Sequence, residues 1–159
     1  MKKKLEITSG AYLTAAAGVT LLPPDVFTAV FSAAAVHELF HLLILRLLCV
    51  PVYRITLDWA GVKIRCGAMT PGDEFLCSCA GPVGSLSLLT LGSVFPMVAL
   101  FGLIQGIFNL IPIYPLDGGR MVSAAVSGLF PNSGKYLTPL ISLLFLLLYI
   151  LICMRLSSK

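Results

Sequence analysis

Long apolar runs alternate with short polar breaks along the chain. Apolar residues dominate positions 7–22, 26–50, 75–92, 96–113 and 138–154. At about 1.5 Å per residue, a helix of about 20 residues crosses a hydrocarbon core of roughly 30 Å. The pattern therefore predicts five transmembrane helices, or six if a short helix over residues 118–130 also crosses the membrane.

The first apolar run follows three lysines, an arrangement that resembles a signal peptide. Pro23-Pro24-Asp25 follows the run where a signal peptide would carry a small-residue cleavage site, and further apolar runs come after it. We therefore expect residues 7–22 to be retained as a span.

Residues 53–70 have a different pattern. β-Branched and aromatic residues alternate there with Arg54, Asp58, Lys63 and Arg65, around a turn expected at Ala60-Gly61. Such alternation predicts a β-hairpin at the membrane surface. The predicted fold is an all-α integral membrane helix bundle with a small membrane-surface β-hairpin, in which residues 1–159 form a single membrane-embedded domain with no attached regulatory domain.

The composition agrees with a membrane protein. Hydrophobic residues make up 58% of the 159 residues and charged residues 11%, against roughly 45–50% and 25% in soluble domains. A net charge of +4 without a polar basic domain argues against nucleic-acid binding. The five cysteines are odd in number and form no C-x-x-C pair, which argues against a disulfide framework or a four-thiolate zinc site.

The distribution of cations predicts the orientation. The N-terminal lysines and the hairpin cations fall on one side of the membrane if the first two runs both cross it, and the Pro23–Asp25 turn on the other side has no cation. Since cytoplasmic loops carry an excess of Lys and Arg, the N-terminus and the hairpin are expected in the cytoplasm.

Both histidines of the chain lie in His37-Glu38-Leu39-Phe40-His41, inside the second apolar run. Their i, i+4 spacing puts two imidazoles on one helical face, where they can bind one Zn²⁺. Glu38 lies on an adjoining face, placed to take a proton from a zinc-bound water. This motif also occurs by chance, but at membrane depth such residues are costly unless they are paired.

Two histidines and a water leave tetrahedral zinc one protein ligand short. Since the chain has no third histidine, an acid is expected, and Asp117 differs from the other acids because it follows a long apolar span in a segment broken by Pro112 and Pro115. The alternative for Asp117 is an N-cap of the following helix. Asn109 could cap or bridge helices through hydrogen bonds.

These motifs resemble the site-2 protease family of intramembrane zinc metalloproteases. The resemblance rests on three blocks whose order and spacing match the family across roughly residues 26–125, namely His37-Glu38-Leu39-Phe40-His41, Ala80-Gly81-Pro82, and Asn109-x-x-Pro112-x-x-Pro115-Leu116-Asp117-Gly118-Gly119. Within the family, the chain is most similar to the compact bacterial branch that includes the sporulation factor-processing protease.

The resemblance implies that His37, His41 and Asp117 bind zinc, that Glu38 is the general base, and that Asn109 lies near the substrate. It also implies that the hairpin offers an edge to an extended substrate strand, and that the substrates are membrane-anchored proteins of a bacterial plasma membrane. The family often has Asn where this chain has Ser85, which leaves one supporting hydrogen bond open.

Three other interpretations remain open at this point. The bundle could be a catalytically silent module that binds a membrane partner. It could also be a metal-permeation protein, although that function predicts polar residues spread over several spans. Gly81-Pro82 could be only a packing and kink feature.

Overall fold

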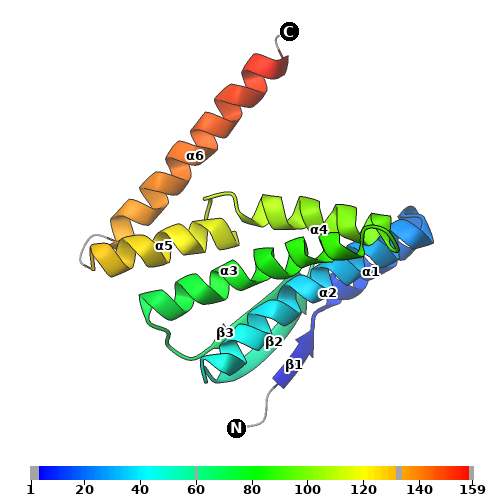
Figure 1. Ribbon diagram of the computed structural model, residues 1–159, viewed down its shortest axis with the longest axis horizontal. Helices are drawn as coiled ribbons and strands as arrows, with labels where there is room; N and C mark the ends of the chain where they lie inside the picture. The colour runs from blue at the N-terminus through cyan, green and yellow to red at the C-terminus, as the bar shows by residue number, and fades with distance from the viewer. Residues whose placement is uncertain (1–3, 60, 132–133, 158–159) are drawn as a thin grey trace.

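The computed structural model describes residues 4–59, 61–131 and 134–157. In this part of the chain, most of the helices lie packed beside one another, and a small sheet lies at one side of them (Figure 1). The elements in order are β1 Lys4–Ile7, α1 Ser9–Leu21, α2 Pro24–Leu47, β2 Val52–Asp58, β3 Gly61–Cys66, α3 Pro71–Ser87, the 3₁₀ turn η1 Leu88–Leu91, α4 Pro96–Asn109, α5 Asp117–Leu129 and α6 Gly134–Ser157.

Helices α2, α3 and α4 pack against one another, and α5 packs on α3. Small residues allow this close packing: Ala29 and Ala33 on α2 are buried, and a Cβ at Gly102 of α4 would lie 2.6 Å from the carbonyl oxygen of Ser85. Small residues at helix contacts are typical of membrane bundles, where close backbone approach supplies the packing energy.

Three of the described helical segments are long and apolar enough to cross a membrane: Pro24–Leu47, Pro71–Leu91 and Leu137–Ser157. They match the predicted runs 26–50, 75–92 and 138–154. The other two predicted spans are shorter in the structure, since α1 has 13 residues and α4 has 14, or about 20 Å each. Prolines at positions 23, 24, 112 and 115 bound these two helices, so the structure provides three helices of crossing length where the pattern predicted five or six.

The predicted hairpin is present as β2 and β3, which pair antiparallel, and the sheet gains a third strand that the sequence analysis did not predict. Strand β1 lies parallel to β2, with Lys4 opposite Arg54, and the sheet order is β1-β2-β3. Of the predicted turn, Ala60 lies outside the described residues, and Gly61 has φ of +116°, a conformation that favours glycine.

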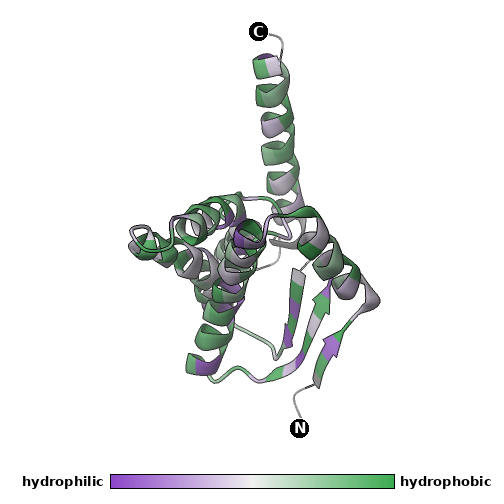
Figure 2. Ribbon diagram, turned by 90° about the vertical axis from the view of Figure 1, so that its right-hand side faces the viewer, coloured by the Kyte–Doolittle hydropathy of each residue, from purple (hydrophilic) through white to green (hydrophobic). Residues whose placement is uncertain are grey.

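Helix α6 projects away from the rest of the chain, and apolar colour covers most of its length (Figures 1 and 2). It packs on α5, and Ser142 accepts a hydrogen bond from the backbone N–H of Tyr114 at 3.2 Å. Its large side chains from Leu143 to Ile152 are all exposed. Apolar surface of this extent is costly in water and favourable in lipid, and with the other long apolar helices it makes the chain an integral membrane protein.

Candidate metal centre

The two histidines of α2 face the interior of the bundle. His37 and His41 keep only 4% and 6% of their surface exposed, and their Nε2 atoms lie 3.3 Å apart. The i, i+4 spacing on a regular helix brings both rings to the same face, as the sequence predicted.

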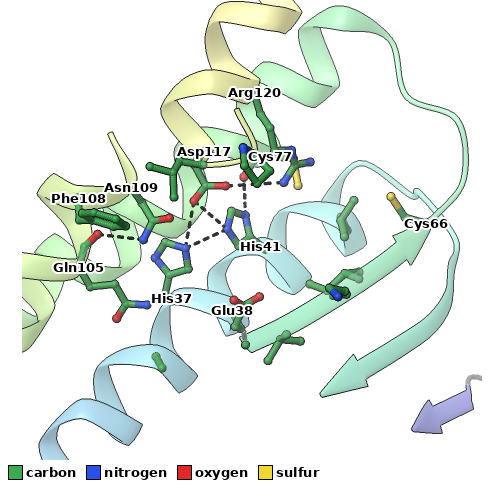
Figure 3. Close-up of a pocket in the computed structure, with 18 residues that line it drawn as sticks. His37, Glu38, His41, Cys66, Cys77, Gln105, Phe108, Asn109, Asp117 and Arg120 are labelled. Carbon is green, nitrogen blue, oxygen red and sulfur yellow. Dashed lines mark hydrogen bonds and ion pairs between the residues drawn. The ribbon is translucent and has the colours of Figure 1, made fainter. Parts of the chain in front are cut away.

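Asp117 completes a group of three. Its Oδ2 lies 3.0 Å from His37 Nε2 and 3.2 Å from His41 Nε2, and Figure 3 shows the three side chains converging. The side chains offer one ligand atom each, all within 4.8 Å of one another, and all three residues are buried. The distant third residue is therefore brought within reach of both imidazoles.

The geometry fits a tetrahedral zinc ion. Zinc bonds of about 2.0–2.2 Å at tetrahedral angles separate the ligand atoms by about 3.4 Å, close to the 3.0–3.3 Å observed here. The Oδ2 atom of Asp117 is buried and has no hydrogen-bond partner among the described residues. A buried oxygen without a hydrogen bond, facing two ring nitrogens, is suited to bind a metal ion.

The other ring nitrogens are held by α3. His41 Nδ1 lies 2.8 Å from the carbonyl oxygen of Cys77, and because a carbonyl only accepts, this nitrogen donates and leaves the Nε2 lone pair free. His37 Nδ1 lies 2.8 Å from the hydroxyl of Ser85, which is fully buried. Ser85 thus makes a hydrogen bond to a candidate ligand, which answers the question that its place in the motif left open.

The segment before α5 places Asp117. Leu116 occupies the N-cap position and Asp117 is the first residue of the helix, so the alternative of Asp117 as N-cap is wrong. A carboxylate in the first turn is stabilised by the positive end of the helix dipole. A side chain at Gly118 or Gly119 would collide with the backbone of residues 110–114, so the paired glycines let the broken segment fold closely over this turn.

Gly81 leaves space for the imidazole rings of His37 and His41 because it has no side chain. A Cβ at this position would lie 2.6 Å from His37 Nε2 and against His41 Nε2. Cys77, Gly81 and Ser85 are spaced i, i+4, i+8 on α3, so one face of this helix contacts both histidines through a carbonyl, a bare backbone and a hydroxyl. Gly81 therefore adjoins both candidate metal ligands as well as allowing close helix packing.

A cavity of about 600 Å³ opens beside the three residues. Glu38 lines it one residue from His37, and Asn109 lines it from the end of α4, where its Nδ2 donates to the Gln105 carbonyl at 3.0 Å (Figure 3). All five residues singled out by the sequence thus border one space. Strand β3 contributes to the wall from the opposite side, with Gly61, Val62, Lys63, Ile64 and Cys66.

Arg120 also lines the cavity, although its place in the sequence predicted no role for it. Its Nη1 lies 3.6 Å from Asp117 Oδ1. A signal was present, since a cation three residues after a buried acid faces it across one helical turn. The contact of the Cys77 carbonyl had no such signal, because any residue type supplies a carbonyl.

Comparison with known proteins agrees with these features. The sequence profile of Peptidase family M50 matches residues 67–150. The zinc metalloprotease MJ0392 of Methanocaldococcus jannaschii is 30% identical over 183 residues, covering 98% of this chain and 54% of that protein. Rip3 of Mycobacterium tuberculosis is 37% identical over 107 residues, covering 55% of this chain and 27% of Rip3. The chain thus spans between about a quarter and a half of the length of these curated relatives.

The fold also has a solved counterpart. The structure of the site-2 protease from Methanocaldococcus jannaschii superposes with a TM-score of 0.69 at 24% identity, covering 99% of this chain and 84% of the other. That likeness establishes the helical membrane fold with its small sheet. Because the family match covers more than half of the 159 residues, the chain belongs to Peptidase family M50, the site-2 protease family.

Proposed function

We propose that this chain is an intramembrane zinc metalloprotease that cleaves membrane-anchored proteins within or next to their transmembrane segments. The observation that carries the proposal is the convergence of His37, His41 and Asp117 within a membrane bundle, beside a cavity that Glu38 also lines. The 159 residues would act together as one membrane-embedded catalytic domain.

His37, His41 and Asp117 would hold the metal through Nε2, Nε2 and Oδ2. When bound there, zinc supplies Lewis acidity to a peptide carbonyl and lets a water molecule lose a proton near neutral pH. The hydrogen bonds of His37 with the Ser85 hydroxyl and of His41 to the Cys77 carbonyl hold the two rings in the orientation that this binding needs. Asp117 adds a negative charge, which favours retention of a divalent cation in an apolar bundle.

Glu38 would move the proton. It follows His37 directly and shares the cavity with the three metal-binding candidates. A carboxylate in this place can accept a proton from the attacking water and donate it to the amine that leaves when the peptide bond breaks. A glutamine keeps the shape of the side chain and cannot accept that proton.

Strand β3 would bind the substrate. It is the outer strand of the sheet on the side of the cavity, since the order is β1-β2-β3. A helical substrate hides its carbonyls in its own hydrogen bonds, whereas a segment added to the edge of β3 is extended and presents them. Asn109, at the end of α4 on the same cavity, would hydrogen-bond to the bound segment.

The orientation in the membrane belongs to the same proposal. Pairing of β1 with β2 supports a common side for the N-terminal segment and the hairpin, because both strands belong to one sheet. The cations of this sheet favour the cytoplasmic side. We place the protein in a bacterial plasma membrane with the N-terminus in the cytoplasm.

The test compares Glu38→Gln with the unchanged protein in the cells that make it and in proteoliposomes. Glu38→Gln should keep its zinc, abolish cleavage and cause membrane-anchored peptides to accumulate. Asp25→Asn, an acid-to-amide change at the exposed start of the same helix, should leave both properties unchanged. Cleavage retained by Glu38→Gln would refute the role of Glu38. If a chelator and Glu38→Gln both leave the membrane peptides unchanged, the chain is a silent partner-binding module.

A further inference from the structure

Arg120 lies between two carboxylates from different helices. Its Nη1 is 3.6 Å from Asp117 Oδ1, and its Nε is 4.0 Å from Glu74 Oε1. Glu74 belongs to the first turn of α3 and Arg120 to the first turn of α5. The guanidinium therefore connects the start of α3 with the candidate metal centre, where Figure 3 shows it beside Asp117.

The position of Arg120 does not favour the helix itself. The N-terminal end of a helix carries partial positive charge, so a cation in the first turn is repelled. The two carboxylates compensate for this repulsion. An arginine at a position that the helix dipole disfavours, beside the cavity, indicates that its side chain has a functional role there.

The two oxygens of Asp117 have different surroundings. Oδ2 faces the Nε2 atoms of both histidines and makes no hydrogen bond to any described residue, whereas Oδ1 faces Arg120. Rotation about the Cβ–Cγ bond would turn the plane of the carboxylate and move Oδ2 away from the Nε2 atoms of both histidines. A planar cation beside Oδ1 opposes that rotation, and Glu74 limits the movement of the cation in turn.

We propose that Arg120, held by Glu74, is a positioning residue that orients the Asp117 carboxylate so that Oδ2 is available to the metal. The inference rests on the proposed metal site and adds to it a chain of charges from α3 through α5. Ligating carboxylates in metal sites are commonly held by outer hydrogen bonds, and loss of such a partner weakens metal binding about 10–100-fold.

The experiment measures zinc affinity of the purified full chain in detergent by competition with a chromophoric chelator. Arg120→Met should weaken zinc binding by about 10–100-fold. Arg120→Lys, which keeps a cation, should restore part of the affinity, and Glu74→Gln should weaken binding in the same direction. Arg46→Met, a change at an exposed arginine near the end of α2, is the control and should bind zinc like the unchanged protein.

A coupling measurement separates positioning from a general effect on folding. In an Asp117→Ala background, Arg120→Met should cause no further loss of zinc affinity, because the carboxylate that it orients is gone. An equal loss in both backgrounds would overturn the inference. So would an Arg120→Met protein that binds zinc normally and shows only a raised KM for a cleaved peptide, since Arg120 would then contact substrate.

Failure of the role of Arg120 can be distinguished from misfolding of the variant and from failure of the proposed function. If Arg120→Met does not fold, Glu74→Gln reports on the same chain of charges from its more exposed end, where the Glu74 side chain is 37% exposed, and normal zinc affinity in that variant would contradict the inference. If the unchanged protein binds no zinc, the proposed function fails. If it binds zinc and Arg120→Met binds it equally well, this inference alone fails.

Discussion

Replacing Gly81 by alanine adds one methyl group at the metal centre. The new Cβ would lie 2.6 Å from His37 Nε2 and against His41 Nε2, whereas ordinary contacts begin near about 3.5 Å. Rings or helices must therefore move by about 1 Å. Metal sites tolerate changes in ligand distance of only about 0.2 Å, so Gly81→Ala should lose most of its zinc.

The expected effect on folding is smaller than the effect on the metal. Overpacking costs about 1–3 kcal/mol, and alanine favours a helix interior over glycine by about 1 kcal/mol. The apoprotein should therefore be destabilised by roughly 0–2 kcal/mol and still fold, as the difference of these two contributions. Zinc per chain is measured by elemental analysis, and folding by thermal unfolding of the metal-free protein.

Two other glycines of α3 provide matched controls. At Gly72 the nearest atom to an added Cβ is Thr70 Oγ1 at 3.8 Å, so Gly72→Ala should keep zinc and stability. At Gly84 an added Cβ would collide with the ring of Phe40, so Gly84→Ala should lose stability and bind zinc more tightly than Gly81→Ala does. A Gly81→Ala protein with normal zinc content and affinity would show that Ala80-Gly81-Pro82 serves only packing.

Two further predictions rest on individual contacts, and a third rests on zinc binding to the folded chain. Ser85→Ala leaves His37 Nδ1 without its 2.8 Å partner and should weaken zinc binding about 10–100-fold in chelator competition; normal affinity would mean that this hydrogen bond is dispensable. Lys63 and the backbone N–H of Trp59 hold the pKa of Asp58 below its usual value. Asp58 therefore stabilises the hairpin fully when the pH is above its unfolded pKa of about 3.9, and this stabilisation is lost as the pH falls through its folded pKa. Amide protection of β2 and β3 should decline with acid, and Asp58→Asn should remove that dependence. Zinc at about 1,000 times its dissociation constant should stabilise the protein by about 4 kcal/mol, so chelation should lower the melting temperature, and identical melting curves would contradict a site formed by the folded state.

The metal-binding candidates could be predicted because each has a strong local or compositional signal. The i, i+4 spacing places His37 and His41 next to each other on one helical face, so their proximity follows from the helix alone and needs no information on tertiary structure. Asp117 is a rare acid after a long apolar span, and the cost of a charge at that depth singles it out. The helical membrane class follows from composition for the same reason, since water cannot solvate so much apolar surface.

Features that depend on distant pairing could not be predicted. Strand β1 pairs with β2 across about 50 positions of sequence, and nothing in the local pattern of residues 4–7 specifies that partner. The length of α1 was overestimated chiefly at its start, where Ile7 belongs to β1 and Thr8 is the N-cap. The length of α4 was overestimated because apolar residues continue beyond Asn109 into a segment that proline breaks. Hydropathy indicates which segments can be buried in lipid or in protein, but it does not indicate the residue at which a helix ends.

The contacts of α3 lie between these two cases, because they follow from a matched period. His37 and His41 are four residues apart, and so are Cys77, Gly81 and Ser85. The contacts pair Cys77 with His41 and Ser85 with His37, so the two helices run in opposite directions with their four-residue rows facing each other. A one-turn slip of α3 would move every contact by one member of the row and bring Gly81 opposite a single ring. The glycine at the centre of the row therefore favours one register of the two helices as well as leaving space beside both Nε2 atoms, which is why substitutions on α3 should change zinc affinity although the three candidate ligands lie on α2 and α5.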